Sequence, residues 1–213
     1  MSKINIDRIV KDIKSKTTSL TPVIEAVCNS IDAIGPERTD GVIDIIVKRT
    51  GQRSLNLDNT HTLSNIVSID IVDNGIGFTE ENKDSFDTYR SGFKMSKGGK
   101  GFGRFMYLKY FNNVSIESVF REGDKYKQRS FTFGHADEII ENEQIIDIES
   151  NPDLHTGTVL HLSSIKSFDL DKGLEVIARK LVERLLVFFV TGGKYTPIIT
   201  IKEEDDSNSI VLN

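Results

Sequence analysis

Residues 66–77 read Ile-Val-Ser-Ile-Asp-Ile-Val-Asp-Asn-Gly-Ile-Gly, an apolar stretch that ends in a carboxylate and two glycines. Val67, Ile69 and Ile71 alternate along this stretch and would share one face of an extended chain. This pattern predicts a buried strand. Asp73 continues that face, and a carboxylate at the end of a buried row needs a hydrogen-bond donor. Gly75 and Gly77 would allow a tight turn that brings a ligand close to the backbone. The same Asp-Asn-Gly string is also typical of a simple turn after a strand.

A helix is predicted for residues 21–34, between the cap-and-proline start Thr21-Pro22 and the stop signal Gly35-Pro36. On a helical wheel one side is apolar and forms the predicted core face: Val23, Ile24, Val27, Ile31 and Ile34. The opposite side is polar, with small residues at its flanks: Glu25, Asn29 and Asp32, beside Ala26, Ser30 and Ala33. Small flanks would let a ligand approach closely, whereas a plain solvated stripe is the alternative. Glu25 could deprotonate a water, and Asn29 could ligate Mg²⁺, which prefers oxygen.

Residues 98–104 read Gly-Gly-Lys-Gly-Phe-Gly-Arg and lead into a helix predicted at 102–110. A helix that starts at Phe102 would add the positive end of its dipole. Main-chain N–H groups could face an anion at the four glycines, Gly98, Gly99, Gly101 and Gly103. Nearby basic side chains could neutralise a triphosphate: Lys94, Lys97, Lys100 and Arg104. The spacing matches neither a Walker A loop nor a dinucleotide fingerprint. Residues 86–97 are predicted to be a mobile loop, and a flexible linker with solvated lysines is the alternative for the whole stretch.

The rest of the chain alternates helices and strands. Apolar residues at helical spacing predict a short first helix at Ile6, Ile9, Val10 and Ile13. The same spacing predicts a long late helix at Leu174, Ile177, Leu181, Val182 and Leu185. Further strands are predicted at 42–47, 114–120, 127–133, 145–148, 158–162 and 197–201, with a polar loop at 52–62 and a hairpin at residues 122–124. This order predicts an α+β fold, a two-layer α/β sandwich with a mixed, largely antiparallel sheet.

Bulk composition narrows the functional classes. The 213 residues, 38% hydrophobic and 28% charged, fit one globular domain spanning residues 1–213. A net charge of −5 argues against a dedicated nucleic-acid surface on this chain, although other domains could supply one. The single cysteine excludes an internal disulfide, and neither a signal peptide nor a membrane-spanning run is evident, so we expect a cytoplasmic protein. The four histidines show no ligand spacing for a transition metal.

Taken in order, with Gly157-Thr158 on a later strand, these three segments resemble the GHKL ATPases: DNA gyrase, heat-shock chaperones of the ninety-kilodalton class, histidine kinases and MutL. The resemblance covers roughly residues 21–165. It implies the Bergerat fold, in which helices cover one face of the sheet, with ATP and Mg²⁺ as cofactors.

The resemblance also implies individual roles. Glu25 would be the catalytic base and Asn29 the Mg²⁺ ligand. Asp73 would accept a hydrogen bond from the amino group of adenine, with the Thr158 hydroxyl beside it. The remaining nucleotide-binding positions would be Asp32, Ala33, Gly75, Gly77, Lys94, and residues Gly98, Gly99, Lys100, Gly101, Phe102, Gly103 and Arg104. The glycine-rich loop would act as a lid that closes on the triphosphate.

Glu25 favours a hydrolase, because histidine kinases lack this glutamate and carry an acceptor histidine upstream. We therefore expect an ATPase. A non-hydrolysing ATP-binding switch is the first alternative, and a histidine-kinase-type domain is the second. Gyrase-like and MutL-like enzymes take a catalytic lysine from a following domain, so this chain is expected to be the N-terminal part of a longer protein, slow in isolation and dimerising with nucleotide. Lys194 is a candidate substitute for that lysine.

Overall fold

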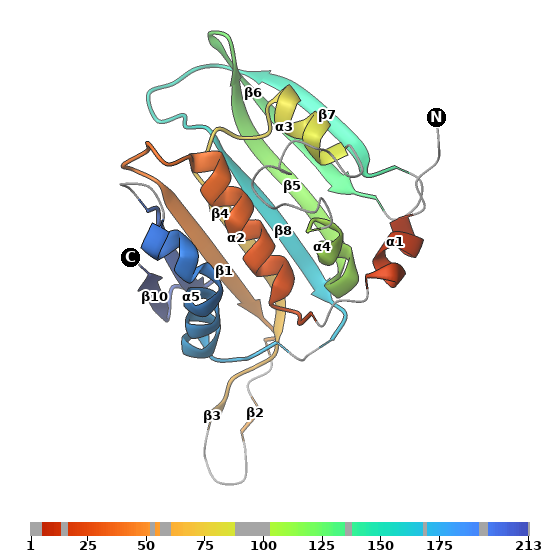
Figure 1. Ribbon diagram of the computed structural model, residues 1–213, viewed down its shortest axis with the longest axis vertical. Helices are drawn as coiled ribbons and strands as arrows, with labels where there is room; N and C mark the ends of the chain where they lie inside the picture. Colours follow the sequence, from red (N-terminus) through yellow and green to blue (C-terminus); the bar gives the residue numbers. More distant parts are fainter. Residues whose placement is uncertain are drawn as a thin grey trace.

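The computed structural model describes residues 6–13, 17–51, 54–55, 61–87, 103–134, 138–167, 170–191 and 196–212. Its centre is an eight-stranded open sheet with the order β10-β9-β1-β4-β8-β5-β6-β7 (Figure 1). The strands are β1 (Val42–Arg49), β4 (Ile66–Asp73), β5 (Phe111–Glu122), β6 (Lys125–Phe133), β7 (Ile140–Ile148), β8 (Gly157–Ile165), β9 (Ile198–Glu203) and β10 (Ser209–Leu212). Neighbouring strands are antiparallel except for the parallel pair β1 and β9. The fold is therefore α+β, with a mostly antiparallel sheet.

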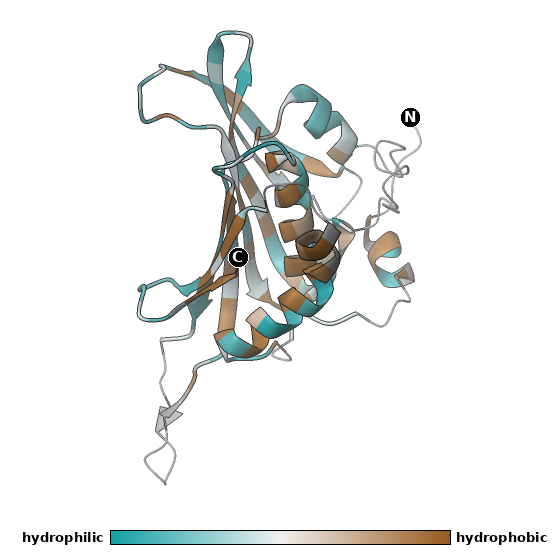
Figure 2. Cartoon of the chain, turned by 60° about the vertical axis from the view of Figure 1, so that its left-hand side comes forward, coloured by the Kyte–Doolittle hydropathy of each residue, from teal (hydrophilic) through white to brown (hydrophobic). Residues whose placement is uncertain are grey.

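The helices lie on one side of this sheet, as the rotated view in Figure 2 shows. They are α1 (Ile6–Asp12), α2 (Thr21–Ile34), α3 (Glu80–Asp87), α4 (Phe105–Tyr110) and α5 (Leu174–Thr191). The core lies between the helices and one face of the strands, where alternate strand residues are fully buried, among them Ile43, Ile45, Ile69, Ile71 and Leu162. The opposite face of the sheet carries polar residues at the intervening positions, including Asp44, Lys48 and His161. This alternation is the expected pattern for a sheet covered on one side.

The predicted elements differ from the structure mainly at their ends. Helix α4 begins at Phe105, and β7 extends over residues 140–148, which is longer than the predicted strand. The loop at 52–62 contains a two-residue pairing between β2 (Ser54–Leu55) and β3 (His61–Thr62). Strand β10 was not predicted, and it pairs with β9 at the edge of the sheet.

Helix α3 contradicts the predicted loop at its first residues. Phe86 belongs to α3 and packs against Phe131 and Phe133 of β6, so it is not part of a mobile segment. Thr79 caps the N-terminus of the helix: its hydroxyl accepts a hydrogen bond from the N–H of Asn82 at 3.3 Å. Glu80 and Glu81 in the first turn also stabilise the helix, because negative charge is favourable near the positive end of the helix dipole. Residues 88–97 of the predicted loop lie outside the described part of the chain.

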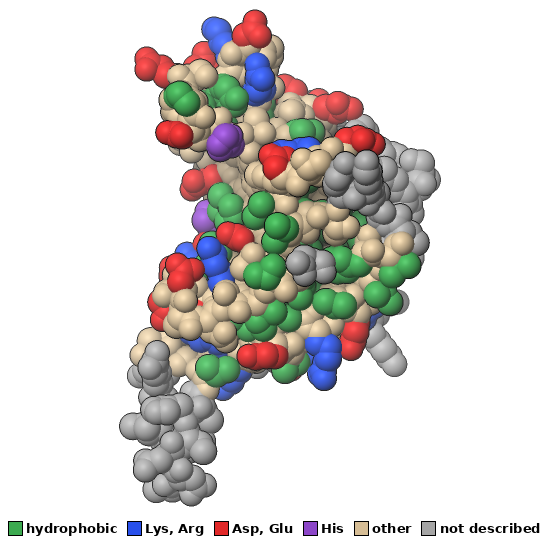
Figure 3. Space-filling view, turned by 90° about the vertical axis from the view of Figure 1, so that its left-hand side faces the viewer, with side chains coloured by type: hydrophobic (Ala, Val, Ile, Leu, Met, Phe, Trp, Pro, Cys, Tyr) green, Lys and Arg blue, Asp and Glu red, His purple; other side chains and the backbone are tan. Residues whose placement is uncertain are grey.

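The edge of the sheet formed by β9 and β10, together with α5, exposes large apolar side chains. Leu186, Val190, Ile198 and Val211 are between 48% and 72% exposed. Figure 3 views the molecule from this side and shows apolar side chains gathered over its lower half, with most of the charged side chains at its upper end and margins.

Candidate functional site

Four polar residues form a row across four neighbouring strands on the helix-covered face of the sheet. Asp73 of β4 lies opposite Thr158 of β8, which lies opposite Ser118 of β5, which lies opposite Arg129 of β6. Each of these pairs is directly in register, so the side chains are lateral neighbours on one face. Asp73, Ser118 and Arg129 are buried, and Thr158 is half-buried. The row lies beneath the chain segment that leaves β4.

Asp73 is surrounded by hydrogen-bond donors from three elements. Ser30 of α2 donates from Oγ to Oδ2 at 2.8 Å, and the main-chain N–H of Gly75 donates to Oδ1 at 2.9 Å. Burial raises the pKa of Asp73 above its usual range, while Ser30 and the main-chain N–H groups of Gly75 and Thr158 act to lower it. The bond to Gly75 is the simple Asx turn that the sequence left open as an alternative. Asp73 as a whole is 9% exposed.

The turn after Asp73 is fixed by the close approach of its glycines. Gly77 has a φ of +78°, and a Cβ there would overlap the carbonyl oxygen of Val119 on β5. A Cβ on Gly75 would lie 2.8 Å from the Cβ of Ala33. The N–H of Ile76 also donates to the Ala33 carbonyl at 3.1 Å, so the turn is held against the C-terminal end of α2. Both glycines are therefore required by packing, whether or not a ligand binds.

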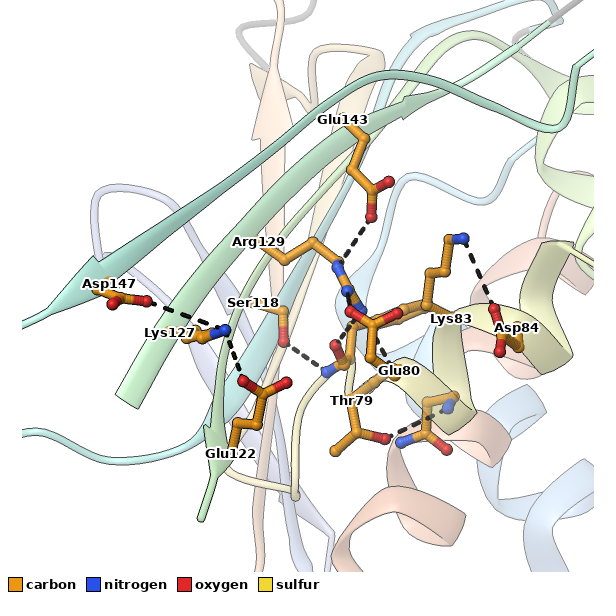
Figure 4. Close-up of polar contacts among 12 residues, drawn as sticks. Thr79, Glu80, Lys83, Asp84, Ser118, Glu122, Lys127, Arg129, Glu143 and Asp147 are labelled. Atoms are coloured by element: carbon orange, nitrogen blue, oxygen red, sulfur yellow. Dashed lines mark hydrogen bonds and ion pairs between the residues drawn. The ribbon is translucent and has the colours of Figure 1, made fainter. Parts of the chain in front are cut away.

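Arg129 anchors the segment that follows this turn (Figure 4). Its guanidinium is fully buried and donates to the Phe78 carbonyl at 2.6 Å and to the Thr79 carbonyl at 3.1 Å. It forms ion pairs with Glu80 and, at 3.0 Å from Nε, with Glu143 of β7. The N–H of Phe78 is bound by Ser118 Oγ at 2.8 Å. Both polar groups of the Phe78 backbone are thus held by the sheet.

Helix α2 brings Glu25 and Asn29 towards the start of α4. A Cβ on Gly103 would overlap the Glu25 carboxylate, so these two residues are in direct contact. Asn29 Nδ2 donates to the Tyr107 hydroxyl at 3.2 Å. Burial raises the pKa of Tyr107 above its usual range, with Asn29 opposing the shift. Glu25 is half-buried, and Asn29 and Asp32 are exposed. The first and third sequence segments therefore meet at Glu25 and Gly103.

The predicted wheel of α2 requires a correction. Ala26 and Ser30, taken as small flanks of an open polar side, are 3% and 5% exposed and face the rest of the protein. Ile24 and Ile31 of the predicted core face are only partly buried. The cause is the close approach of β4, which places Asp73 and Gly75 against Ser30 and Ala33. The helix also begins without a side-chain cap, because the N-cap position is Leu20 rather than Thr21, and Thr21 Oγ1 accepts from the N–H of Thr18.

Arg104, a predicted phosphate ligand, lies in an aromatic environment. Its guanidinium is within 5.4 Å of the Phe86 ring centre and 5.1 Å of the Phe105 ring centre, and Nη1 is 3.4 Å from the Ser85 carbonyl. Only 9% of the residue is exposed, and burial lowers its pKa to about 10, opposed by Asp87 and Tyr107. This geometry ties α4 to the end of α3 through a cation–π arrangement.

Several predicted site residues lie outside the described part of the chain: Lys94, Gly98, Gly99, Lys100, Gly101 and Phe102, together with Lys194. Their predicted roles stay predictions. Of the remaining positions, the structure brings together Asp73, Gly75, Gly77, Ala33 and Thr158 at the end of β4. Glu25, Asn29 and Gly103 form the neighbouring group at α4.

Sequence reasoning missed Ser118 and Arg129. A signal for both was present in the alternation of their strands. Ser118 interrupts the buried apolar series Val114, Ile116 and Phe120, and Arg129 precedes the buried residues Phe131 and Phe133 in the same phase. A polar residue at a buried strand position needs partners, so each should be read as a candidate contact.

Beside the turn at Asn74, a hollow of about 410 Å³ opens between the ends of several strands. Its lining is polar and aromatic: Arg38, Asp40, Asn74, Arg121, Tyr126, His155 and Thr156. Arg38 makes a two-point ion pair with Asp40 at 2.9 and 2.8 Å and donates to the Asn74 carbonyl. Arg121 lies 5.4 Å from the ring centre of Tyr126. The hollow adjoins the Asp73 turn through Asn74.

No family model matches the chain, and no curated protein matches it in sequence. None of the helices in the described ranges has the length and hydropathy that a membrane span requires. Within those same ranges, no cluster of three or more His, Cys, Asp or Glu residues could hold a metal ion.

Proposed function

We propose that this chain is an ATP-binding and ATP-hydrolysing domain of the GHKL type, with a Bergerat fold. The single observation that carries the proposal is the bonding of Asp73. An ionised carboxylate offers about four lone-pair sites, and the hydrogen bonds donated by Ser30 and Gly75 use two of them. Acceptor capacity therefore remains on Asp73, a residue that is 9% exposed, so a further donor can be accommodated. The amino group of adenine is such a donor.

The residues around α4 fit the phosphate end of such a ligand. Glu25 is half-buried beside Gly103, where it could orient and deprotonate a water for attack on a phosphorus. Asn29 lies on the same helix one turn after Glu25, and an amide oxygen is a ligand type that a hard cation such as Mg²⁺ prefers. When bound, Mg²⁺ would neutralise phosphate charge; the protein residues hold and orient the reacting groups.

The glycine-rich segment ending at Gly103 would supply main-chain N–H groups to the triphosphate. We propose that it closes on ATP as a lid and that closure promotes dimerisation of the full-length protein. The mostly antiparallel sheet with helices on one face supports the proposed fold. The contact between Glu25 and Gly103 supports placing this segment next to the catalytic base.

The test is ATP binding and turnover by the purified chain with Mg²⁺. The proposal predicts saturable binding and slow phosphate release, with Glu25→Ala abolishing release while affinity stays within about threefold, since a general base acts on the barrier. Binding without turnover in the wild type would assign the non-hydrolysing switch instead. Label transfer to a protein histidine would assign the kinase alternative, and failure to bind ATP would refute the proposal.

A further inference from the structure

Strand β7 forms one edge of the sheet, and β10 forms the other (Figure 1). Within the described ranges, β7 pairs with β6 on one side and with no strand on the other. Such an edge leaves main-chain N–H and C=O groups that an added strand can bind. Proteins commonly protect edge strands by keeping them very short or by placing Lys or Pro in them. Strand β10 has four residues, whereas β7 has nine and contains neither Lys nor Pro.

The turn between β5 and β6 determines which main-chain groups of β7 point outwards. Its two residues make the flanking residues a hydrogen-bonded pair, and such pairs recur at every second position along the two strands. Residues 126 and 128 of β6 lie between those pairs, so they direct their main-chain groups to β7, opposite residues 148 and 146. The register shift between β6 and β7 lies outside these positions. The alternate residues of β7 therefore direct their N–H and C=O groups away from the sheet: Ile145 and Asp147.

Both faces of this edge carry a large apolar side chain that is open to water. Ile145 and Ile146 are 43% and 54% exposed, and as neighbours on a strand they point to opposite faces of the sheet. An added strand with an apolar residue opposite each of them would remove both side chains from water, which favours its binding.

Acidic side chains flank Ile145 on its own face of the sheet. Glu143 and Asp147 lie two residues before and after it, so all three share that face. Two basic residues of β6, Arg129 and Lys127, bind these carboxylates, and each also binds a further carboxylate (Figure 4). Four carboxylates therefore share two basic side chains. The wider sequence agrees, because residues 130–165 contain no Lys or Arg and seven acidic residues: Asp137, Glu138, Glu141, Glu143, Asp147, Glu149 and Asp153.

We propose that the β7 edge binds an extended basic segment of another protein, which adds a ninth strand to the sheet. The added strand bonds to the main chain of Ile145 and Asp147. It places Lys or Arg opposite Glu143 and Asp147, and an apolar residue opposite Ile145. The partner therefore carries the pattern basic-x-apolar-x-basic, which is the same in either strand direction.

Charge also argues against a second copy of this chain as the occupant. Two β7 edges paired antiparallel around Ile145 would place Glu143 of one copy opposite Asp147 of the other, and like charges directly opposite each other destabilise a strand pair. The proposed contacts use no residue assigned to ATP, so this surface is independent of the proposed function.

The test adds the end-blocked peptide Thr-Lys-Val-Val-Val-Lys-Thr to the purified chain without nucleotide, and follows amide hydrogen exchange. Saturating peptide should slow exchange roughly fivefold or more at Ile145 and Asp147, whose N–H groups point outwards. Ile146 and Ile148 already bond to β6 and should change little. A peptide with Glu in place of Lys, and one with an N-methyl group on its central Val, should not bind. Binding without protection at the two outward amides, or no binding at all, would overturn the proposal.

A charge-reversal variant tests the side-chain part of the proposal. Asp147→Lys should weaken peptide binding by about fivefold or more, because it replaces an attractive cross-strand pair with a repulsive one. Glu175→Lys makes the same change of charge at an exposed position on α5 and should keep the wild-type affinity. Equal weakening in both variants would show attraction by overall charge and would overturn the edge site. Protection of the same two amides by dimerisation of the chain alone would assign a second copy instead and overturn the proposed partner.

Discussion

Ser30 of α2 donates a hydrogen bond of 2.8 Å to Oδ2 of Asp73 at the end of β4. The bond joins the helix layer to the sheet at the candidate site, and both residues are buried. It orients the carboxylate so that Oδ1 accepts from Gly75 while lone-pair capacity remains for a ligand. Asp73 thus has a structural role and a proposed binding role, and the two can be separated by experiment.

The raised pKa of Asp73 predicts a specific pH dependence of stability. The folded protein holds this proton to a higher pH than the unfolded chain does, so the contribution of Asp73 is greatest below the unfolded pKa of 3.8. It is lost as pH rises through the folded pKa. The free energy of unfolding of the wild type, minus that of Asp73→Asn, should therefore decrease as the pH rises from below 3.8 through the raised folded-state pKa. Urea titrations across this range measure the difference, and an increase would contradict the assigned direction.

Arg129→Met should destabilise the fold by about 2 kcal/mol, because the carbonyls of Phe78 and Thr79 lose their donor. This loss of stability should be smaller than the loss on breaking a fully buried ion pair. The side chains of Glu80 and Glu143 are 57% and 31% exposed, so their carboxylates can be hydrated once Arg129 is removed. Arg121→Met, at an exposed position on β5, is the control and should cost less than about 1 kcal/mol. Equal losses in urea-induced unfolding would show that Arg129 has no special anchoring role.

Gly103→Ala should affect turnover more than nucleotide affinity. The added methyl group would overlap the Glu25 carboxylate, which is the end of a flexible side chain and can move away. A displaced base should reduce the hydrolysis rate by roughly tenfold or more, with a smaller change in ATP affinity. Gly51→Ala, where no atom lies within 4 Å of the added Cβ, should leave both unchanged. Loss of affinity with normal turnover in Gly103→Ala would argue against Glu25 as the base.

Much of the fold could be predicted because local signals agreed with tertiary packing. Helix α2 has the predicted bounds, since Pro22 lies in its first turn and Gly35 ends it with a φ of +79°. The hairpin between β5 and β6 was predicted from its alternation and from residues 122–124. Helix α3 was missed because it is strongly polar and short, and its stability comes from the Thr79 cap and from Phe86 packing against β6.

The candidate site was predicted less completely, because its contacts depend on strand register. The sequence predicted Asp73 as a buried acceptor and placed Thr158 on a later strand. The direct opposition of Asp73, Thr158, Ser118 and Arg129 requires knowing which strands are neighbours. The aromatic surroundings of Arg104 likewise depend on Phe86 being helical. Local pattern cannot supply such long-range pairings.

The most direct test of the central claim is the affinity of ATP for Asp73→Asn, measured by calorimetry beside the wild type. The amide replaces an acceptor with a donor facing the amino group of adenine, which should cost about 2–4 kcal/mol, or roughly 30- to 1000-fold in affinity. Asp44→Asn, a half-buried aspartate on the opposite face of β1, is the control and should bind ATP normally. We predict loss of binding in Asp73→Asn with a retained far-ultraviolet circular dichroism spectrum. Unchanged affinity in that folded variant would contradict the assignment of Asp73 to the adenine site.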